Sequence, residues 1–135
     1  MPNVANRIRL YATVVVLAHL VVNLVHGSAH QQLHIDLSST QMLFVVAVIL
    51  IGPLVALPLL WSRAQRLGFG LLALTMGGAL IFGLYNHFVA AGPDHVSAQG
   101  TGQWGTTFVI TAWLLLMAEA AGTYIGLRYS RSVIE

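Results

Sequence analysis

Four long apolar segments place the tightest limit on what this chain can fold into. They cover about residues 11–30, 42–60, 67–91 and 107–127, and each has the roughly 20 residues that a helix needs to cross a bilayer. Lipid offers the backbone no hydrogen bonds, and the alternating polarity of barrel strands is absent, so we expect helices. The sequence predicts an all-α, integral membrane four-helix transmembrane bundle that forms a single domain over residues 1–135.

The composition agrees with a membrane protein. Hydrophobic residues make up 57% of the 135 residues and charged residues only 7%, whereas soluble domains carry roughly a quarter charged residues. Cysteine is absent, which excludes disulfides and thiolate metal sites. The net charge of +2 gives no reason to expect nucleic acid as a partner. The expected partner is the lipid bilayer, and a homo-oligomer or a larger membrane complex stays open.

The basic residues indicate an orientation, because they precede the first apolar segment, separate the second from the third, or follow the fourth. With four spans, all of them lie on one side, which the positive-inside rule assigns to the cytoplasm. Both termini are then cytoplasmic (N-in/C-in), and the loops near residues 30–40 and 92–107 face the periplasm of a bacterial inner membrane. No clear cleavage site follows the first segment, so we expect that segment to be retained. The basic residues are Arg7, Arg9, Arg63, Arg66, Arg128 and Arg131.

Local signals mark the second segment. The sequence SSTQ at residues 38–41 predicts a capping box that opens a helix. Pro53 and Pro58 predict a bend in that helix, since proline lacks the backbone N–H that a helix interior needs. Trp61 and Trp104 lie at segment ends, where aromatic side chains meet the membrane interface.

The stretch HLVVNLVHGSAHQQLHID at residues 19–36 brings polar side chains to the end of the first apolar segment. His19, Asn23, His26, His30 and His34 fall within an arc of about 80° if the helix continues that far. Such a stripe should face the bundle interior, because lipid offers polar groups no partners. The spacing therefore predicts histidines directed at a common site between helices.

Other polar residues are expected at the same, outward end. His87 lies in YNHF near the end of the third segment, at a depth similar to His26, and the outer loops supply Asp36, Asp94 and His95. Neutral imidazole is the commonest protein metal ligand, and histidines four residues apart can hold one ion. The predicted metal ligands are His26, His30, His34, His87 and His95. The predicted second layer or proton relay comprises His19, Asn23, Asp36, Asn86, Asp94 and Glu119.

The function indicated first is binding of a transition metal ion, Cu, Zn or Fe, with redox or metal-dependent chemistry. An alternative is a haem b electron-transfer protein, which could be quinone-linked, with His26 or His30 facing His87 as axial ligands. A further alternative is a structural subunit of a membrane complex, in which histidines only hydrogen-bond, and proton-coupled transport is weaker still. The sequence names no substrate, so whether the protein is an enzyme stays open.

One carboxylate, Glu119, lies within a span, where an isolated charge is costly. Counted along the helices, it reaches the depth of His19, so we predict a contact between them. This contact could relay protons to the outer histidines or simply join two helices. Thr111, Glu119 and Gly122 share an arc of about 80° and should face inward.

Overall fold

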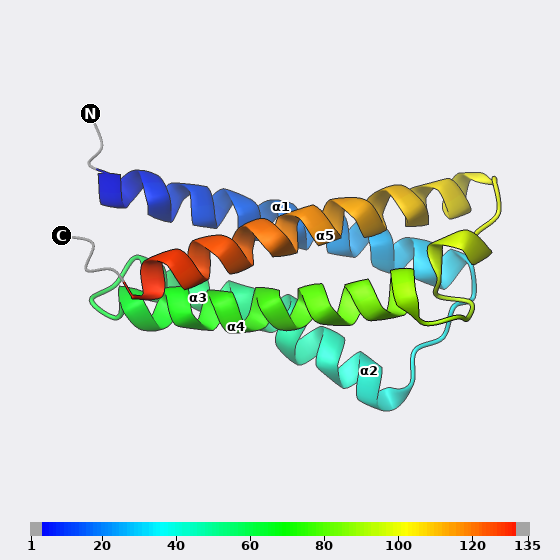
Figure 1. The fold of residues 1–135 in the computed structure, drawn as a ribbon, viewed down its shortest axis with the longest axis horizontal. Coiled ribbons are helices and arrows are strands. Elements are labelled where there is room, and N and C mark those ends of the chain that lie inside the picture. The colour runs from blue at the N-terminus through cyan, green and yellow to red at the C-terminus, as the bar shows by residue number, and fades with distance from the viewer. Residues whose placement is uncertain (1–3, 132–135) are drawn as a thin grey trace.

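The computed structural model describes residues 4–131, and the regular elements in that range are all helices (Figure 1). Four helical segments run along the bundle, and each is long and apolar enough to cross a membrane. The prediction of an all-helical chain with four potential spans is confirmed. The segments are Val4–Gln32, Ser39–Leu60, Gln65–Val89 and Gln103–Ser130.

Two of the four segments combine helical types. A π-helix interrupts the second, and another ends the third. Short π-helical stretches inside α-helices often accompany functional sites. The elements are α1 (Val4–Gln32), α2 (Ser39–Phe44), π-helix η1 (Val45–Ile51), α3 (Gly52–Leu60), α4 (Gln65–Leu84), π-helix η2 (Tyr85–Val89), 3₁₀-helix η3 (Val96–Ala98) and α5 (Gln103–Ser130).

The second segment starts and bends as its sequence indicates. Gln41 N donates to Ser38 Oγ (3.3 Å) and Ser38 N donates to Gln41 Oε1 (2.9 Å), which confirms the capping box. The α-helical pattern gives way to η1 over Val45–Ile51, and Pro53, which lacks a backbone N–H donor, lies at the start of α3 just after it. Beyond this irregular stretch, α2 diverges from α4 (Figure 1).

Most helix boundaries differ from the predicted spans by a few residues, and the differences are clearest at the start of the first helix and the end of the third. The first helix begins at Val4 rather than near residue 11, because its polar N-terminal turn is also helical. The third ends at Val89 rather than 91. There Ala90 turns to extended backbone (ψ 123°), and Pro93 follows shortly, a residue that disfavours helix just before it.

The most extensive packing joins α5 to α4 and to α1, while α3 packs on α4. Phe69, Leu72 and Met76 of α4 are fully buried in this core. A Cβ added to Gly126 of α5 would stand 2.5 Å from the backbone N of Ala73. The close approach of α5 to α4 therefore requires glycine at that position, as expected for small residues between membrane helices.

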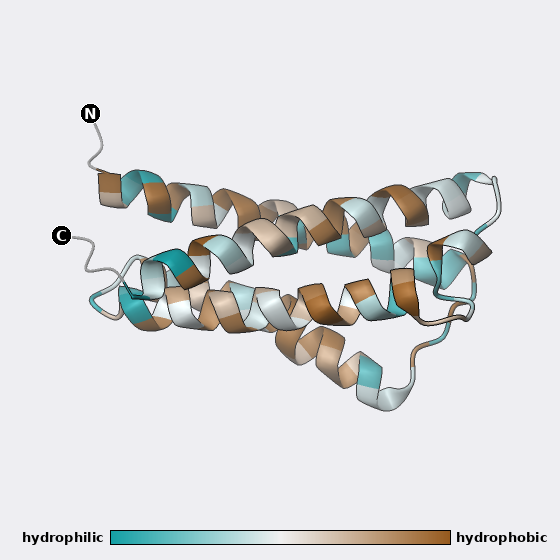
Figure 2. Cartoon of the chain, viewed as in Figure 1, coloured by the Kyte–Doolittle hydropathy of each residue, from teal (hydrophilic) through white to brown (hydrophobic). Residues whose placement is uncertain are grey.

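The outer surface of the bundle is strongly apolar along the helices (Figure 2). Large side chains such as Leu74, Ile81 and Met117 are about 70% exposed (73%, 71% and 67%). A surface of this kind exceeds the apolar patches that soluble monomers leave in water. It is compatible with an integral membrane protein.

The two ends of the bundle differ in chemistry. At one, the arginine end, α1 begins, α3 connects to α4, and α5 ends; the six arginines lie there. The other, the histidine end, contains the loops at residues 33–38 and 90–102 and the candidate site described next.

Candidate metal centre

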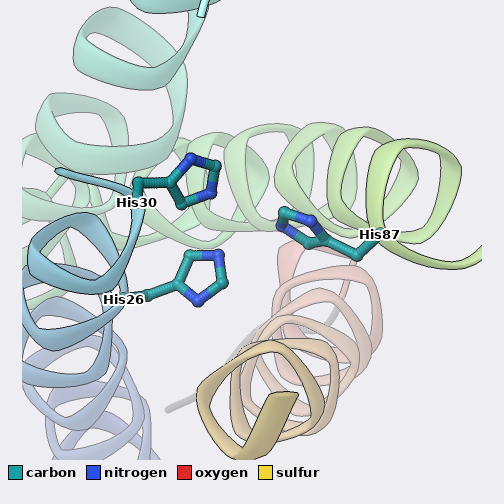
Figure 3. Close-up of side chains that lie close together, drawn as sticks. All are labelled: His26, His30 and His87. Atoms are coloured by element: carbon teal, nitrogen blue, oxygen red, sulfur yellow. The ribbon is translucent and has the colours of Figure 1, made fainter. Parts of the chain in front are cut away.

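Three histidines from two helices meet at the histidine end. His26 and His30 lie one turn apart on α1, and His87 reaches them from η2 (Figure 3). The ring centroids are 4.8 Å apart for His26 and His30, 4.9 Å for His26 and His87, and 5.9 Å for His30 and His87. One ring nitrogen from each lies within 4.8 Å of the other two, so the group could hold a metal ion. The expected shared depth of His26 and His87 is confirmed.

The orientation of His26 is fixed from α5. Its Nδ1 lies 2.8 Å from Thr111 Oγ1, and that hydroxyl itself donates to the backbone O of Thr107 at 2.7 Å. Because the hydroxyl proton is used in this way, His26 Nδ1–H is the donor to Thr111. The neutral ring then has its lone pair on Nε2. His26 Nε2 is buried and has no hydrogen-bond partner.

The other two rings follow the same pattern. His30 Nδ1 donates to the backbone O of Ile35 at 3.4 Å, and His87 Nδ1 donates to the backbone O of Asp94 at 3.1 Å. Each imidazole thus places Nδ1 on a backbone or hydroxyl acceptor, which leaves Nε2 as the candidate metal ligand, although His30 Nε2 lies 3.2 Å from Asp94 Oδ1. Protein metal sites commonly orient their histidine ligands in this way.

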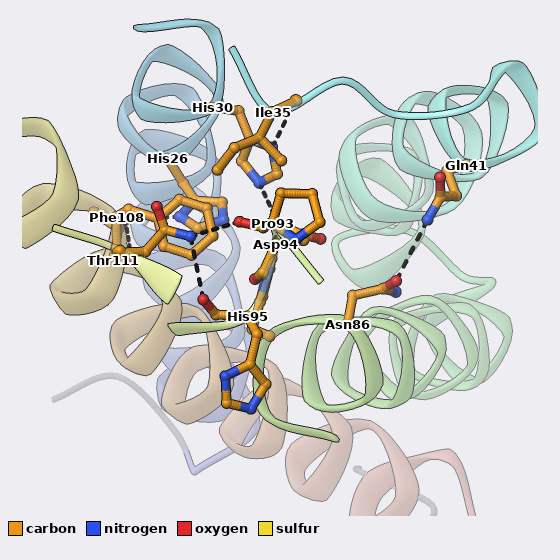
Figure 4. Close-up of polar contacts among 12 residues, drawn as sticks. His26, His30, Ile35, Gln41, Asn86, Pro93, Asp94, His95, Phe108 and Thr111 are labelled. Atoms are coloured by element: carbon orange, nitrogen blue, oxygen red, sulfur yellow. Dashed lines mark hydrogen bonds and ion pairs between the residues drawn. The ribbon is translucent and has the colours of Figure 1, made fainter. Parts of the chain in front are cut away.

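Asp94 brings a carboxylate to the three histidines. Its Oδ1 lies 3.2 Å from His30 Nε2 (Figure 4). The same oxygen lies 3.2 Å from His87 Nδ1. The loop that carries it is held by Gln99, whose Nε2 donates to the backbone O of Pro93 (2.6 Å) and of His95 (3.1 Å). The carboxylate therefore lies where it can bind a cation or balance its charge.

The surroundings of the three rings are apolar on one side and open on another. Phe108 of α5 is fully buried, and its ring centroid lies 4.6 Å from that of His26 and 5.1 Å from that of His30. A cavity of about 600 Å³ extends from His26, His30 and His87 to Glu119. The histidines thus line a space large enough for a small molecule.

A second polar cluster lies deeper in the bundle. His19 Nε2 is 3.2 Å from Glu119 Oε1, and both side chains are almost fully buried, which confirms the predicted contact. Asn23 Nδ2 lies 2.9 Å from His19 Nε2 and donates to the backbone O of His19 at 3.1 Å. Thr111 and Gly122 are also buried, as their helical positions predicted. The other oxygen, Glu119 Oε2, is buried without a hydrogen-bond partner.

Two predicted ligands do not join the three histidines. The predicted stripe required a helix that continues to His34, but α1 ends at Gln32. His34 then adopts a positive φ of 53° and is exposed, so it leaves the helical face that carries His26. His95 Nδ1 instead accepts from Ser97 N at 3.1 Å within the loop.

Two further predicted residues have different surroundings from those expected. Asp36 is exposed and lines the cavity. Asn86 turns toward α2, where its Oδ1 accepts from Gln41 Nε2 at 3.3 Å (Figure 4). Asn86 therefore joins the third segment to the second instead of supporting a histidine.

The sequence reasoning missed the residues that orient the rings. Thr111 was expected to face inward, but its role as acceptor for His26 was not foreseen, nor were Phe108 and the carbonyl of Ile35. The available signal was helical register, because Thr111 and Phe108 lie on the buried face that also carries Glu119.

Comparison with known proteins gives no relative to guide the assignment. No protein-family model matches the chain, and no curated protein or solved structure shows a significant match.

Proposed function

We propose that this chain is an integral membrane protein with a transition metal centre formed by His26, His30 and His87. The observation that carries the proposal is His26 Nε2, a buried nitrogen without a hydrogen-bond partner, in a ring next to two other imidazoles. Buried polar atoms rarely lack a partner. A metal ion bound to all three Nε2 atoms would supply it.

The ring nitrogens are somewhat farther apart than the ligands of a single metal ion, so metal binding would draw the three rings together. With metal–nitrogen bonds of about 2.0–2.1 Å, two ligands of a tetrahedral ion lie about 3.3 Å apart. The three ring nitrogens lie within 4.8 Å of one another, so each ring would move inward by up to about 1 Å. Asp94 Oδ1, at 3.2 Å from His30 Nε2, already has the separation of two ligands on one ion.

The donor set favours Zn, Cu or Fe. Imidazole suits all three, and the chain has no cysteine to select for softer coordination. Three histidines leave a fourth position that Asp94, water or a molecule in the cavity can occupy. A position of that kind is the mark of catalytic rather than structural zinc sites.

The two alternatives are less well supported. An axial pair on haem would need a flat macrocycle between its rings, and the ring centroids of His26 and His87 are only 4.9 Å apart. A histidine that serves only as a hydrogen-bonding strut would use both nitrogens, whereas His26 Nε2 has no partner. A metal ion accounts for both observations.

Metal analysis of the purified protein tests this proposal. After loading with Zn²⁺, Cu²⁺ or Fe²⁺ and removal of excess metal, we expect one tightly bound ion per chain. His26→Ala and His87→Ala should abolish binding, while His34→Ala and His95→Ala, which change histidines outside the cluster, should retain it. Equal binding in all four variants would contradict the proposal, and a Soret absorption band would select haem.

We also propose that the arginine end faces the cytoplasm and the histidine end the periplasm. The absence of cysteine permits a direct test with single cysteines at exposed positions, Ser62→Cys at the arginine end and Ala98→Cys at the histidine end. In intact bacterial cells, a membrane-impermeant maleimide should label Ala98→Cys and not Ser62→Cys until the inner membrane is opened. The reverse pattern would overturn the orientation.

A further inference from the structure

The cavity beside the histidines reaches the side of the bundle. Its lining includes Leu24 and Gly27 of α1, and Met42 and Val46 from the opposite α2–η1 segment, all of them exposed. The cavity therefore opens between α1 and the α2–η1 segment at a mouth formed by these residues. In the proposed membrane orientation the apolar part of this opening, at Leu24, Met42 and Val46, faces lipid, while exposed Asp36 lines the cavity in the outer loop.

Away from the histidines, the interior of the cavity combines apolar walls with an unpartnered carboxyl oxygen. Ile49, Phe82 and Leu115 contribute hydrocarbon and aromatic surface. Glu119 lines the cavity, is only 3% exposed, and has one carboxyl oxygen, Oε2, without a hydrogen-bond partner. A buried carboxyl oxygen beside an unfilled space requires a partner, and a ligand in that space can supply one.

Gly83 connects this carboxyl group with the histidines. A Cβ built on Gly83 would lie 3.5 Å from Glu119 Oε2 and 3.8 Å from His87 Cδ2. One methyl-sized position therefore adjoins both groups, and glycine keeps it open. A polar head placed there would contact Glu119 and lie beside the histidines.

We infer that this cavity binds a membrane-dissolved amphiphile whose head group carries a hydroxyl, with the hydroxyl on Glu119 and the tail leaving between α1 and α2. A hydroxyl can donate to or accept from the carboxyl group, and a neutral head avoids the cost of a charge in lipid. The volume of about 600 Å³ lies within the range of small-molecule sites. The inference goes beyond the metal centre and does not require it, because Glu119 and the apolar walls make the contacts.

Quinols and diacylglycerols share this chemistry, and direct binding distinguishes them. Radiolabelled decyl-benzoquinol and dioctanoylglycerol are titrated onto the purified full-length protein, and we expect saturable one-to-one binding of at least one. Ile49→Phe places a ring in the cavity and should weaken binding at least tenfold. Ile51→Phe, at a 51% exposed position of the same helix that does not line the cavity, should leave binding unchanged.

Two gentler variants test the head-group contact. Glu119→Gln should weaken binding about tenfold, because it removes a charge-capable hydrogen-bond partner while keeping the shape. Gly83→Ala should weaken it as well, whereas Gly70→Ala, with no atom within 4 Å of the added Cβ, should not. Both contacts of the added methyl at Gly83 are of ordinary length, so the fold should tolerate it.

The outcomes separate this inference from the metal proposal. Failure of both amphiphiles to bind, or binding unchanged in Ile49→Phe and Glu119→Gln, overturns the inference. Metal content is measured on the same samples, and Ile49→Phe should keep its metal. A protein that binds an amphiphile without metal would refute the metal centre alone.

Discussion

Replacement of Thr111 by valine removes the only side-chain contact that the structure gives His26 Nδ1, at 2.8 Å, while keeping the size of the side chain. In the metal-free variant the imidazole can change tautomer, which moves its proton from Nδ1 to Nε2. A metal on Nε2 forbids that change, because it requires the proton to remain on Nδ1. The bound state then keeps a buried N–H that has lost its hydroxyl acceptor, and weakening of a buried hydrogen bond in this way costs about 1–3 kcal/mol.

This penalty should appear as weaker metal binding. Loss of such supporting contacts lowers metal affinity about 10- to 100-fold, which corresponds to about 1.4–2.8 kcal/mol. The Kd for Zn²⁺ is measured by competition with a chromophoric chelator for wild type, Thr111→Val and Thr111→Ser. We expect serine, which keeps the hydroxyl, to bind nearly as wild type. Unchanged affinity in Thr111→Val, or equal losses in both variants, would refute the role assigned to this hydroxyl.

Three further predictions concern the scaffold. Gly126→Ala should lower the free energy of unfolding by about 1–3 kcal/mol through overpacking, while Gly70→Ala should leave the Tm in detergent unchanged; equal Tm values would contradict this packing. A double-mutant cycle of His19→Leu and Glu119→Gln should give a coupling energy of about 0.6–1.7 kcal/mol, and strictly additive losses would mean no coupling. Ser38→Ala should destabilise the start of α2 by about 1 kcal/mol, seen as faster amide hydrogen exchange in its first turn.

The histidine pair on α1 and its depth relative to His87 were predictable. The spacing of His26 and His30 places both on one helix face, and the four-span topology brings the end of the third segment to the same level. The His19–Glu119 contact follows from the same counting of depth along two helices. These predictions depend only on helical geometry and the number of spans.

Which of the predicted residues join the site, and how the cavity opens, could not be predicted because both depend on tertiary structure. Helical counting extended the stripe to His34, but where α1 ends is decided by the turn at residues 33–35, where Ile35 N bonds back to His30 O at 3.0 Å. The divergence of α2, which opens the cavity, arises from the π-helical stretch and the loops around it. No local pattern in the sequence specifies how far two helices separate.

X-ray absorption spectroscopy of the metal-loaded protein tests the central claim most directly. The extended fine structure at the metal edge counts the imidazole ligands and measures their distances. For the wild-type protein we predict three imidazole nitrogens at about 2.0–2.1 Å from the metal. If His26→Ala is loaded at high metal concentration, the number of imidazole ligands should fall to two. A spectrum with one imidazole or none around the ion in the wild-type protein would contradict the three-histidine centre.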